Sequence, residues 1–448
     1  MNLLGRWSLA SFMKVVIDVA YFGLLVIIAL ICAVSLWLAL TPARRGLRDS
    51  LDLKLPVRYQ LDPAMHPFSS TDAHLKAASI MDSQGDLVVK GAASSAVTLW
   101  ATFGFALISL ATALFVLNRL RAIFRTLKDQ NPFVTANPSR IRMIGLALML
   151  GQLISAAGMA WLTPRVTRGL SIAGITFENR LSFTPWVFFS GVILIMLAEV
   201  FRLGAQMKGD LETARKIQFD LVPGEAFRLN DAVVCARMTP ARAVGGDFYD
   251  YRDLEDGRLA VVVGDVMGKG LPAALLMSSV LGSVRVLLSA GLRGKELVAA
   301  LNRYVCADTS GGRLVTLFYG ELDITTGDLT YVNAGHNPPL LSRAEGGFER
   351  LEPTAMILGF APDGAVETCQ ARIGPADRLL VFTDGLSEAF NRKNEEYGEP
   401  RLRDSLARSR MLPPPAAVDR LVADVRGFCG SAPQHDDMTL LLVARQPA

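Results

Sequence analysis

Residues 259–270 read LAVVVGDVMGKG, and residues 271–280 read LPAALLMSSV. The β-branched run Leu259–Gly264 predicts a buried strand, and the apolar spacing over Leu271–Leu288 predicts a helix. Asp265 stands between the two, at the end of the strand and among glycines. An aspartate beside a glycine after a strand is most often part of a turn, so a function for it depends on other acids joining it.

Three further segments carry acids next to glycines or next to the end of a predicted strand. They read GGDFYD at 245–250, FTDG at 382–385 and HDDMT at 435–439. Carboxylates gathered at one edge of a sheet repel one another unless hard divalent cations neutralise them, and oxygen ligands suit Mg²⁺ or Mn²⁺. The candidate site residues are Asp247, Asp265, Asp384, Asp436 and Asp437.

Other features exclude competing chemistries. The loop GDVMGKG lacks the glycine and lysine spacing of a phosphate-binding P-loop. The five cysteines form no CxxC pair and no C-x₅-R arrangement, which disfavours a soft-metal site and a thiol phosphatase. Isolated cysteines are typical of a reducing compartment.

The C-terminal half is predicted to be a layered α+β domain. Turns such as Thr326-Gly327-Asp328 indicate antiparallel hairpins, and the helices group apart from the strands. Besides the elements around Asp265, the predicted helices are Lys295–Ala307 and Pro415–Cys429. The further predicted strands are Ala232–Met238, Leu314–Leu322, Leu329–Asn333, Leu379–Thr383 and Met438–Val443.

The order and spacing of these motifs closely resemble the SpoIIE/RsbU-type family of metal-dependent Ser/Thr phosphatases, relatives of protein phosphatase 2C in the PPM superfamily. The resemblance covers about residues 210–446, from ARKIQFDLVP through AVGGDFYDY, VVGDVMGKG and VFTDGLSEAFN to HDDMTLLL. It implies an α-β-β-α sandwich with two divalent cations, Mn²⁺ or Mg²⁺, and a metal-activated water that attacks phosphorus.

The resemblance also implies roles for individual residues. Asp247 would contact both ions, and Asp265 would bind one or both beside the Val266 carbonyl. Asp384 would hold one ion and Asp436 would supply the last ligand, with Asp437 as its close support. No position departs from the family pattern, so we expect an active enzyme. The family's usual target is a phosphorylated, anti-anti-sigma-factor-like cytoplasmic protein in a partner-switching pathway.

Three other residues near these motifs have open roles. Lys269 is expected to contact substrate or to cap the following helix. His336 is either a catalytic acid or part of a structural turn, and the resemblance favours the turn. His435 is left out of the site, because a side chain next to a metal ligand on a strand points to the opposite face.

The N-terminal half differs in composition. Apolar residues make up 51% of the chain, whose mean hydropathy is +0.33. Residues 1–204 hold 19 Lys and Arg against 10 Asp and Glu, whereas residues 205–448 hold 27 against 32. The basic excess lies among apolar runs, which argues against nucleic-acid binding. Four uncharged runs are long enough to cross a bilayer: Val19–Leu40, Gly91–Asn118, Met143–Pro164 and Leu181–Ala198.

We interpret these runs as four transmembrane helices rather than buried helices of a soluble domain. The first run is longer than a signal-peptide core and has no small-x-small cleavage site after it. The loop at 119–142 is rich in Lys and Arg, which predicts that it is cytoplasmic. Both chain ends then lie in the cytoplasm of a bacterial inner-membrane protein, and the 42–93 and 165–180 loops face outside.

Some features of this half stay open. His66 and His74 in the first outer loop are either a metal pair or plain surface. Residues 15–210, with NPF at 131–133 and EVFRLG at 199–204, resemble a bacterial family of uncharacterised four-span membrane proteins. A receptor with a binding-only C-terminal domain and a channel with a regulatory tail are the alternatives. Charges within the spans are too sparse for an obvious ion path.

An amphipathic stripe connects the halves. Apolar residues recur every three or four positions from Leu203 to Leu221, and Pro223-Gly224 ends the pattern. We predict a linker helix over 205–228 between a membrane domain at 1–204 and the phosphatase domain at 229–446. The helix either packs on the next domain or forms a parallel two-helix connector that makes the protein a homodimer.

Overall fold

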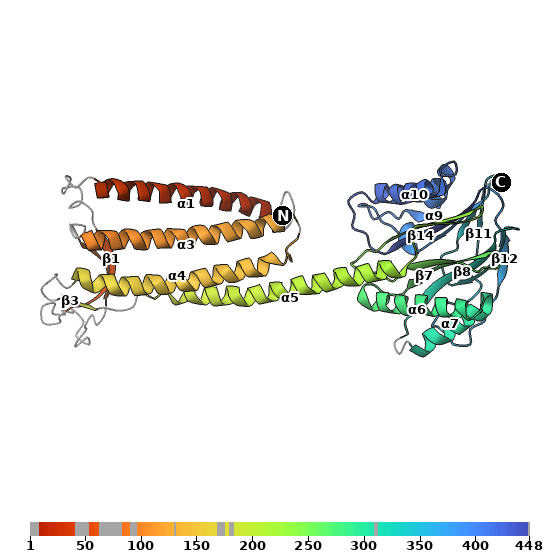
Figure 1. The fold of residues 1–448 in the computed structure, drawn as a ribbon, viewed down its shortest axis with the longest axis horizontal. Helices are drawn as coiled ribbons and strands as arrows, with labels where there is room; N and C mark the ends of the chain where they lie inside the picture. The colour runs from red at the N-terminus through yellow and green to blue at the C-terminus, as the bar shows by residue number, and fades with distance from the viewer. Residues whose placement is uncertain are drawn as a thin grey trace, which may run out of the picture. The chain divides into compact units, whose positions relative to one another are not determined.

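The computed structural model describes residues 9–40, 53–61, 83–89, 96–129, 131–167, 175–178, 183–308 and 312–446. The chain divides into two compact units, Met1–Lys208 and Gly209–Ala448, and each is described here by itself (Figure 1). His66 and His74, the candidate metal pair of the outer loop, lie outside the described residues.

The first unit is built from long apolar helices. These are α1 (Leu9–Leu40), α3 (Ala96–Lys128), α4 (Ala136–Thr167) and α5 (Pro185–Leu221), and each overlaps one predicted span. Their outward side chains are strongly apolar: Val19 is 68% exposed and Trp186 is 81% exposed. Helices with satisfied backbones and apolar surfaces are what a bilayer requires.

Among the described residues, five helices are long and apolar enough to cross a membrane. The fifth is α6 (Leu271–Ser289) in the second unit. It differs from the others because six of its side chains are buried in a core shared with strands and another helix, among them Met277, Leu281 and Val284. Its hydropathy is therefore explained by packing within the second unit.

Glycines and one buried amide organise the helices of the first unit. A Cβ on Gly145 of α4 would lie 2.6 Å from the backbone oxygen of Gly191 on α5, so these two helices cross at close range. In the first turn of α4, Asn137 is fully buried and donates to Thr126 Oγ1 and to the Pro132 carbonyl, both at 2.8 Å. The NPF segment thus forms a fixed connection between α3 and α4.

A small sheet joins the two loops that were expected to face outside. β1 (Leu53–Leu61) pairs antiparallel with β2 (Ser83–Val89) and with β3 (Ile175–Glu178). The first two strands come from the 42–93 loop and the third from the 165–180 loop, so both loops meet at one end of the unit. Two long helices, α3 and α4, separate these loops along the chain, so the chain returns to the same end of the unit.

The second unit contains two antiparallel sheets. The six-stranded sheet has the order β11-β10-β13-β14-β5-β4, and the five-stranded sheet has the order β12-β9-β8-β7-β6. In that order the first sheet comprises Phe348–Arg350, Leu340–Ser342, Arg378–Phe382, Met438–Arg445, Ala232–Thr239 and Ala226–Leu229. The second comprises Cys369–Arg372, Asp328–Ala334, Val315–Asp323, Arg258–Val266 and Phe248–Asp253.

Helices cover the outer face of each sheet. Helices α6 and α7 (Gly294–Asp308) lie on the five-stranded sheet, and α9 (Gly398–Arg408) and α10 (Pro414–Cys429) lie on the six-stranded sheet (Figure 1). The unit is therefore an α-β-β-α sandwich. Between the four layers lie three apolar cores.

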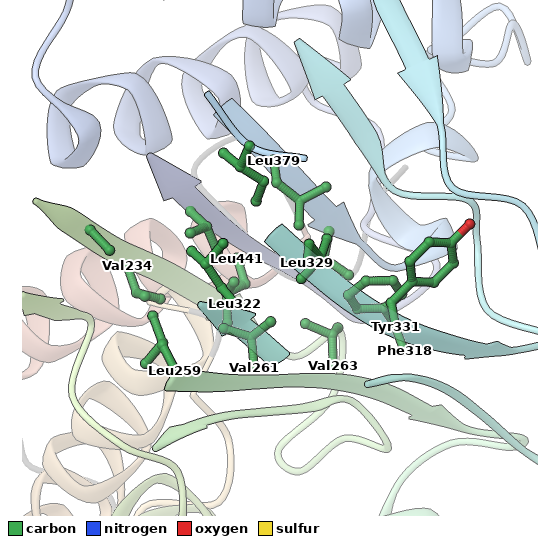
Figure 2. Close-up of a cluster of buried hydrophobic side chains, with 14 of the residues drawn as sticks. Val234, Leu259, Val261, Val263, Phe318, Leu322, Leu329, Tyr331, Leu379 and Leu441 are labelled. Carbon is green, nitrogen blue, oxygen red and sulfur yellow. The ribbon is translucent and has the colours of Figure 1, made fainter. Parts of the chain in front are cut away.

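Strand β7 shows why the central strands are apolar on both faces. Leu259, Val261 and Val263 belong to the core between the sheets, which Figure 2 shows with their partners. Ala260 and Val262 belong to the core between the sheet and α6 and α7. With both faces buried, polar and apolar residues do not alternate along such a strand.

The predicted strands and helices of this half are all present, with ends within two residues of those expected. Sequence reasoning missed the strands β4, β6, β10, β11 and β12 and the helices α8 (Asp384–Ser387) and α9. The predicted linker helix over 205–228 is wrong at its C-terminal end. The helix ends at Leu221, and Ala226–Leu229 pairs with β5 as a strand, since Pro223 cannot donate a helical N–H.

Candidate metal centre

Two of the predicted acids lie on neighbouring strands of the five-stranded sheet. Asp247 directly precedes β6, and Asp265 is the next-to-last residue of β7. Their carboxyl groups are close enough that the charge of Asp265 acts directly on Asp247. Asp247 is only 2% exposed, and its Oδ2 accepts a hydrogen bond from Thr383 Oγ1 at 2.7 Å. The antiparallel pairing of β6 and β7 thus brings these two acids together.

Two more acids come from the facing six-stranded sheet. Asp384 begins the short helix α8, one residue after Thr383 and the end of β13. Asp436 stands just before β14, which pairs with β13. Each of these acids acts electrostatically on Asp265. We call Asp247, Asp265, Asp384 and Asp436 the acid cluster.

The acid cluster disfavours its own ionisation. Burial, followed by the charges of Asp265 and Asp437, raises the pKa of Asp247 well above its usual range. Burial and then the charge of Asp384 raise the pKa of Asp265 to about 7. Burial and then the charge of Asp436 raise the pKa of Asp384 to about 6. A bound cation reverses this preference, because positive charge stabilises the carboxylates.

Asp437 is buried beside the cluster, and both of its carboxylate oxygens accept hydrogen bonds from backbone N–H groups. Its Oδ1 accepts the N–H of Ala241 and its Oδ2 accepts the N–H of Gly246, both at 2.7 Å. Burial is the main cause of its raised pKa. The side chain therefore holds the 241–246 loop, which leads directly into Asp247.

The Val266 carbonyl lies against the same loop. A Cβ on Gly246 would come within 2.7 Å of the Val266 oxygen, so only glycine fits there without displacement. The loop that carries Asp247 therefore passes directly beside the carbonyl that follows Asp265. This places one backbone oxygen at the edge of the acid cluster.

Lys269 brings a positive charge to the acid cluster. Its Nζ lies 2.7 Å from Asp436 Oδ2 and donates to the His435 carbonyl at 2.7 Å. Helix α6 begins at Leu271 without a side-chain cap, so the capping role considered for Lys269 is not seen. The lysine neutralises one acid of the four and leaves the cluster with an excess of carboxylates.

The two histidines have different surroundings. His336 is buried, its Nδ1 lies 2.9 Å from Thr316 Oγ1, and its backbone N–H donates to Asn333 Oδ1 at 2.8 Å. These contacts belong to the turn after β9. The expectation that His435 lies on a strand and points away from the acids is wrong, because the residue lies in the segment before β14. Its ring stands edge-on to the Phe390 ring, with 6.2 Å between the ring centroids.

The arrangement fits hard divalent cations better than a closed protein cage. In the part of the chain that the structure describes, no three His, Cys, Asp or Glu side chains are grouped to hold an ion directly. Mg²⁺ typically keeps several waters and binds through one or two carboxylates. One buried carboxylate, Asp247, beside three partly exposed ones that share its negative charge has that chemistry.

A cavity of about 270 Å³ borders the acid cluster. Asp436 and Gly385, the residue after Asp384, form part of its wall. Apolar Phe390 and Met438 and the charged Arg426 also line it. Its volume lies just below the range of drug-sized ligand pockets, which leaves room for a side chain rather than a cofactor.

Sequence reasoning missed Thr383. Its fully buried hydroxyl donates to Asp247 and accepts the N–H of Thr439 at 3.0 Å, so it joins the strand end at β13 to the acid across the sandwich. The residue precedes the predicted ligand in FTDG, but only the approach of the two sheets reveals its partner.

Part of the chain is similar in sequence to known proteins. The family described as Stage II sporulation protein E (SpoIIE) matches residues 255–446, which include Asp265, Asp384 and both acids of the last motif. Protein IcfG of Synechocystis is 29% identical over 53% of this chain and 41% of its own length. Phosphoserine phosphatase RsbU of Bacillus subtilis is 26% identical over 54% of this chain and 71% of its own length.

Solved structures also match about half of this chain. The crystal structure of the RsbU and RsbW domains of a Mycobacterium tuberculosis protein has 32% identity and a TM-score of 0.43, over 50% of this chain and 62% of that one. The SiaA-PP2C domain of Pseudomonas aeruginosa has 22% identity and a TM-score of 0.48, over 55% and 99%.

The family match lies within the second unit, and the curated relatives named above align with about half of the chain. The sandwich fold, the acids at its strand ends and the family match together assign the second unit to a family. The second unit of this chain is a SpoIIE/RsbU-type domain of the PPM phosphatase superfamily, and it follows a first unit of apolar helices long enough to span a membrane.

Proposed function

We propose that this chain is a membrane-anchored, metal-dependent protein phosphatase that hydrolyses phosphoserine or phosphothreonine on a cytoplasmic regulatory protein. The observation that carries the proposal is the acid cluster: three carboxylates at strand ends of two sheets lie within electrostatic range of Asp265, and burial together with mutual repulsion raises the pKa of at least three of the four. The names of RsbU and RsbP, both phosphoserine phosphatases, support the substrate class.

The acid cluster and the Val266 carbonyl would hold two divalent cations, Mn²⁺ or Mg²⁺, with Asp437 as support for the loop. When bound, such ions activate water and screen the charge of a phosphate. The chain's own groups set the geometry. Thr383 and Asp437 fix Asp247 and the loop before it, and the Lys269 ammonium lies beside Asp436, within the acids' field, where it can attract a phosphoryl oxygen.

The substrate enters beside the cavity next to Asp384 and Asp436. We propose that a side chain flanking the phosphorylated residue occupies this cavity. Partner switching, with an anti-anti-sigma-factor-like substrate, is supported by the RsbU and RsbP relatives. The four long helices of the first unit would place the protein in a bacterial inner membrane with both ends in the cytoplasm, and α5 would pair with its copy in a homodimer.

The test uses the full chain in detergent with p-nitrophenyl phosphate and with Mn²⁺ or Mg²⁺. Turnover should appear only with metal and should fall at least about 100-fold in Asp265→Asn and in Asp384→Asn, because loss of groups that merely orient ligands already costs 10–100-fold. Arg372→Gln, an exposed change on the edge strand β12, is the control. Turnover that survives both aspartate changes is incompatible with the proposal.

The substrate is tested with a trapping variant. Asp265→Asn should retain a phosphorylated partner that the active protein releases, and the captured protein can be identified by mass spectrometry. Capture of a phosphoprotein together with absence of turnover in the unmodified chain would instead favour the binding-module reading of the second unit.

A further inference from the structure

The last turns of α5 carry a buried glutamine. Gln218 is only 3% exposed, although its neighbour Ile217 is 58% exposed. A buried amide has two donors and an acceptor that need partners. Its position on the inward face of the helix therefore calls for a polar partner in the second unit.

That partner is the backbone of Gly245. Gln218 Nε2 donates to the Gly245 carbonyl at 2.7 Å, and the Gly245 N–H donates to Gln218 Oε1 at 3.1 Å. The pair is reciprocal, so it fixes both the position and the orientation of this peptide. Gly245 lies two residues before Asp247, the most buried acid of the cluster.

Further hydrogen bonds fasten the end of α5 to the strand that follows Asp247. Arg285 of α6 donates to the Leu221 carbonyl and to Asp250 Oδ2, both at 2.7 Å. The Tyr249 hydroxyl donates to the Pro223 carbonyl at 3.0 Å. Asp250 and Tyr249 both belong to β6. The loop and strand on either side of Asp247 are thus both tied to the end of α5.

We infer that Gln218 is a positioning residue for Asp247 and that the seating of the last turns of α5 sets the metal affinity of the acid cluster. The inference rests on the proposed function. Gln218 touches neither an acid of the cluster nor substrate; it acts through Gly245. Withdrawal of Gln218 from Gly245 would release the loop and weaken metal binding. Since α5 begins at Pro185, within the fourth predicted span, this contact would give the membrane helices a means of control.

The experiment compares Gln218→Met with Lys216→Met in the full chain in detergent. Both changes introduce the same side chain on α5, but Lys216 is exposed. Calorimetric titration of the metal-free protein with Mn²⁺ measures affinity without any turnover. We expect the Mn²⁺ Kd to rise about 10–100-fold in Gln218→Met, as for other groups that orient metal ligands, and to stay unchanged in Lys216→Met.

Kinetics separate positioning from a general structural role. At saturating Mn²⁺ the kcat of Gln218→Met should return to within a few fold of the unmodified chain, with unchanged KM for p-nitrophenyl phosphate. Gln218→Glu keeps the acceptor and the size of the side chain and loses the donor to Gly245, so it should also bind Mn²⁺ more weakly. It serves as the second variant if Gln218→Met does not fold.

The outcomes are distinguishable. A lower melting temperature with unchanged Mn²⁺ Kd in both glutamine variants would reduce Gln218 to a structural residue and overturn the inference, while the proposed function stands. Failure of the unmodified chain to bind Mn²⁺ and to turn over substrate would overturn the proposed function, and the inference with it.

Discussion

Individual hydrogen bonds fix the position of Asp247 and of the loop before it. Thr383 spans from the six-stranded sheet to Asp247, and Asp437 spans from the start of β14 to the loop before Asp247. Neither residue needs to touch an ion to matter. A metal ligand that is free to rotate loses affinity, so the groups that orient it are part of the site.

Thr383→Val tests whether the Thr383 hydroxyl orients Asp247. The change keeps the shape of the side chain but removes the hydroxyl that donates to Asp247 Oδ2 and accepts from Thr439 N–H. We expect the Mn²⁺ concentration for half-maximal activity to rise about tenfold. Thr383→Ser restores the hydroxyl and is the control. Equal Mn²⁺ requirements in the valine and serine variants would contradict the role assigned to the hydroxyl.

His336 makes the second unit sensitive to acid. Burial lowers its pKa from an ordinary value of 6.5 to about 4, so the folded state stays unprotonated where the unfolded state binds a proton. The unfolded state is therefore favoured as the pH falls from about 6.5 to about 4. By linkage, the loss of stability from this one group is about 2 kcal/mol at pH 5.

The measurement is urea unfolding of the 209–448 unit at pH 7 and pH 5. His336→Gln should lose about 2 kcal/mol less than the unmodified unit between these pH values. His435→Gln, a change at an exposed histidine, should follow the unmodified unit. An identical pH dependence in all three proteins would show that His336 does not titrate as expected.

At the scale of elements, local pattern predicted the central strands better than the edges. Strands β5, β7, β8, β13 and β14 are apolar on one or both faces and are framed by turns, so their residues alone indicate them. The edge strands β11 and β12 are three and four residues long and half-exposed. Their pairing, with β10 and β9, gives them their conformation, and no local pattern encodes that.

The crossing of α4 and α5 depends on glycine. Gly145→Ala places a methyl group 2.6 Å from the Gly191 carbonyl oxygen, so the helices must separate. We expect a loss of about 1–3 kcal/mol, the usual range for overpacking. Gly104→Ala on α3 is the matched control, because nothing lies within 4 Å of its added methyl group.

Thermal unfolding of the full chain in detergent measures both changes. Alanine is a better helix former than glycine by about 1 kcal/mol. Gly104→Ala should therefore leave the melting temperature of the first unit unchanged or raise it. If Gly145→Ala raises it equally, the close approach of the two helices does not contribute to stability.

At the scale of the whole molecule, the uneven charge of the chain follows from its two units. The basic excess of residues 1–204 includes the 119–142 loop, and the acidic excess of residues 205–448 includes the acid cluster. A Lys- and Arg-rich loop between two spans predicts a cytoplasmic side. This orientation would place the sheet of β1, β2 and β3 on the opposite side.

Reporter fusions test this orientation. Alkaline phosphatase, which is active only outside the cytoplasm, should be active when fused within the 42–93 loop and inactive when fused after residue 130. A fluorescent protein fused after Ala448 should be fluorescent. The reverse pattern would place the phosphatase unit outside the cell and remove its access to a cytoplasmic substrate.

Two kinds of information were thus separable in this protein. The residues alone determined the apolar spans, the central strands and the longer helices of the sandwich and the five candidate acids, because hydropathy, periodicity and motif order are local properties. Only the tertiary structure decided that Asp437 is occupied by Ala241 and Gly246, that Thr383 orients Asp247 and that Gln218 pairs with Gly245. These partners are separated by 27 to 196 positions along the chain. Contacts at such separations depend on how sheets and helices pack, and no local pattern in the sequence specifies them.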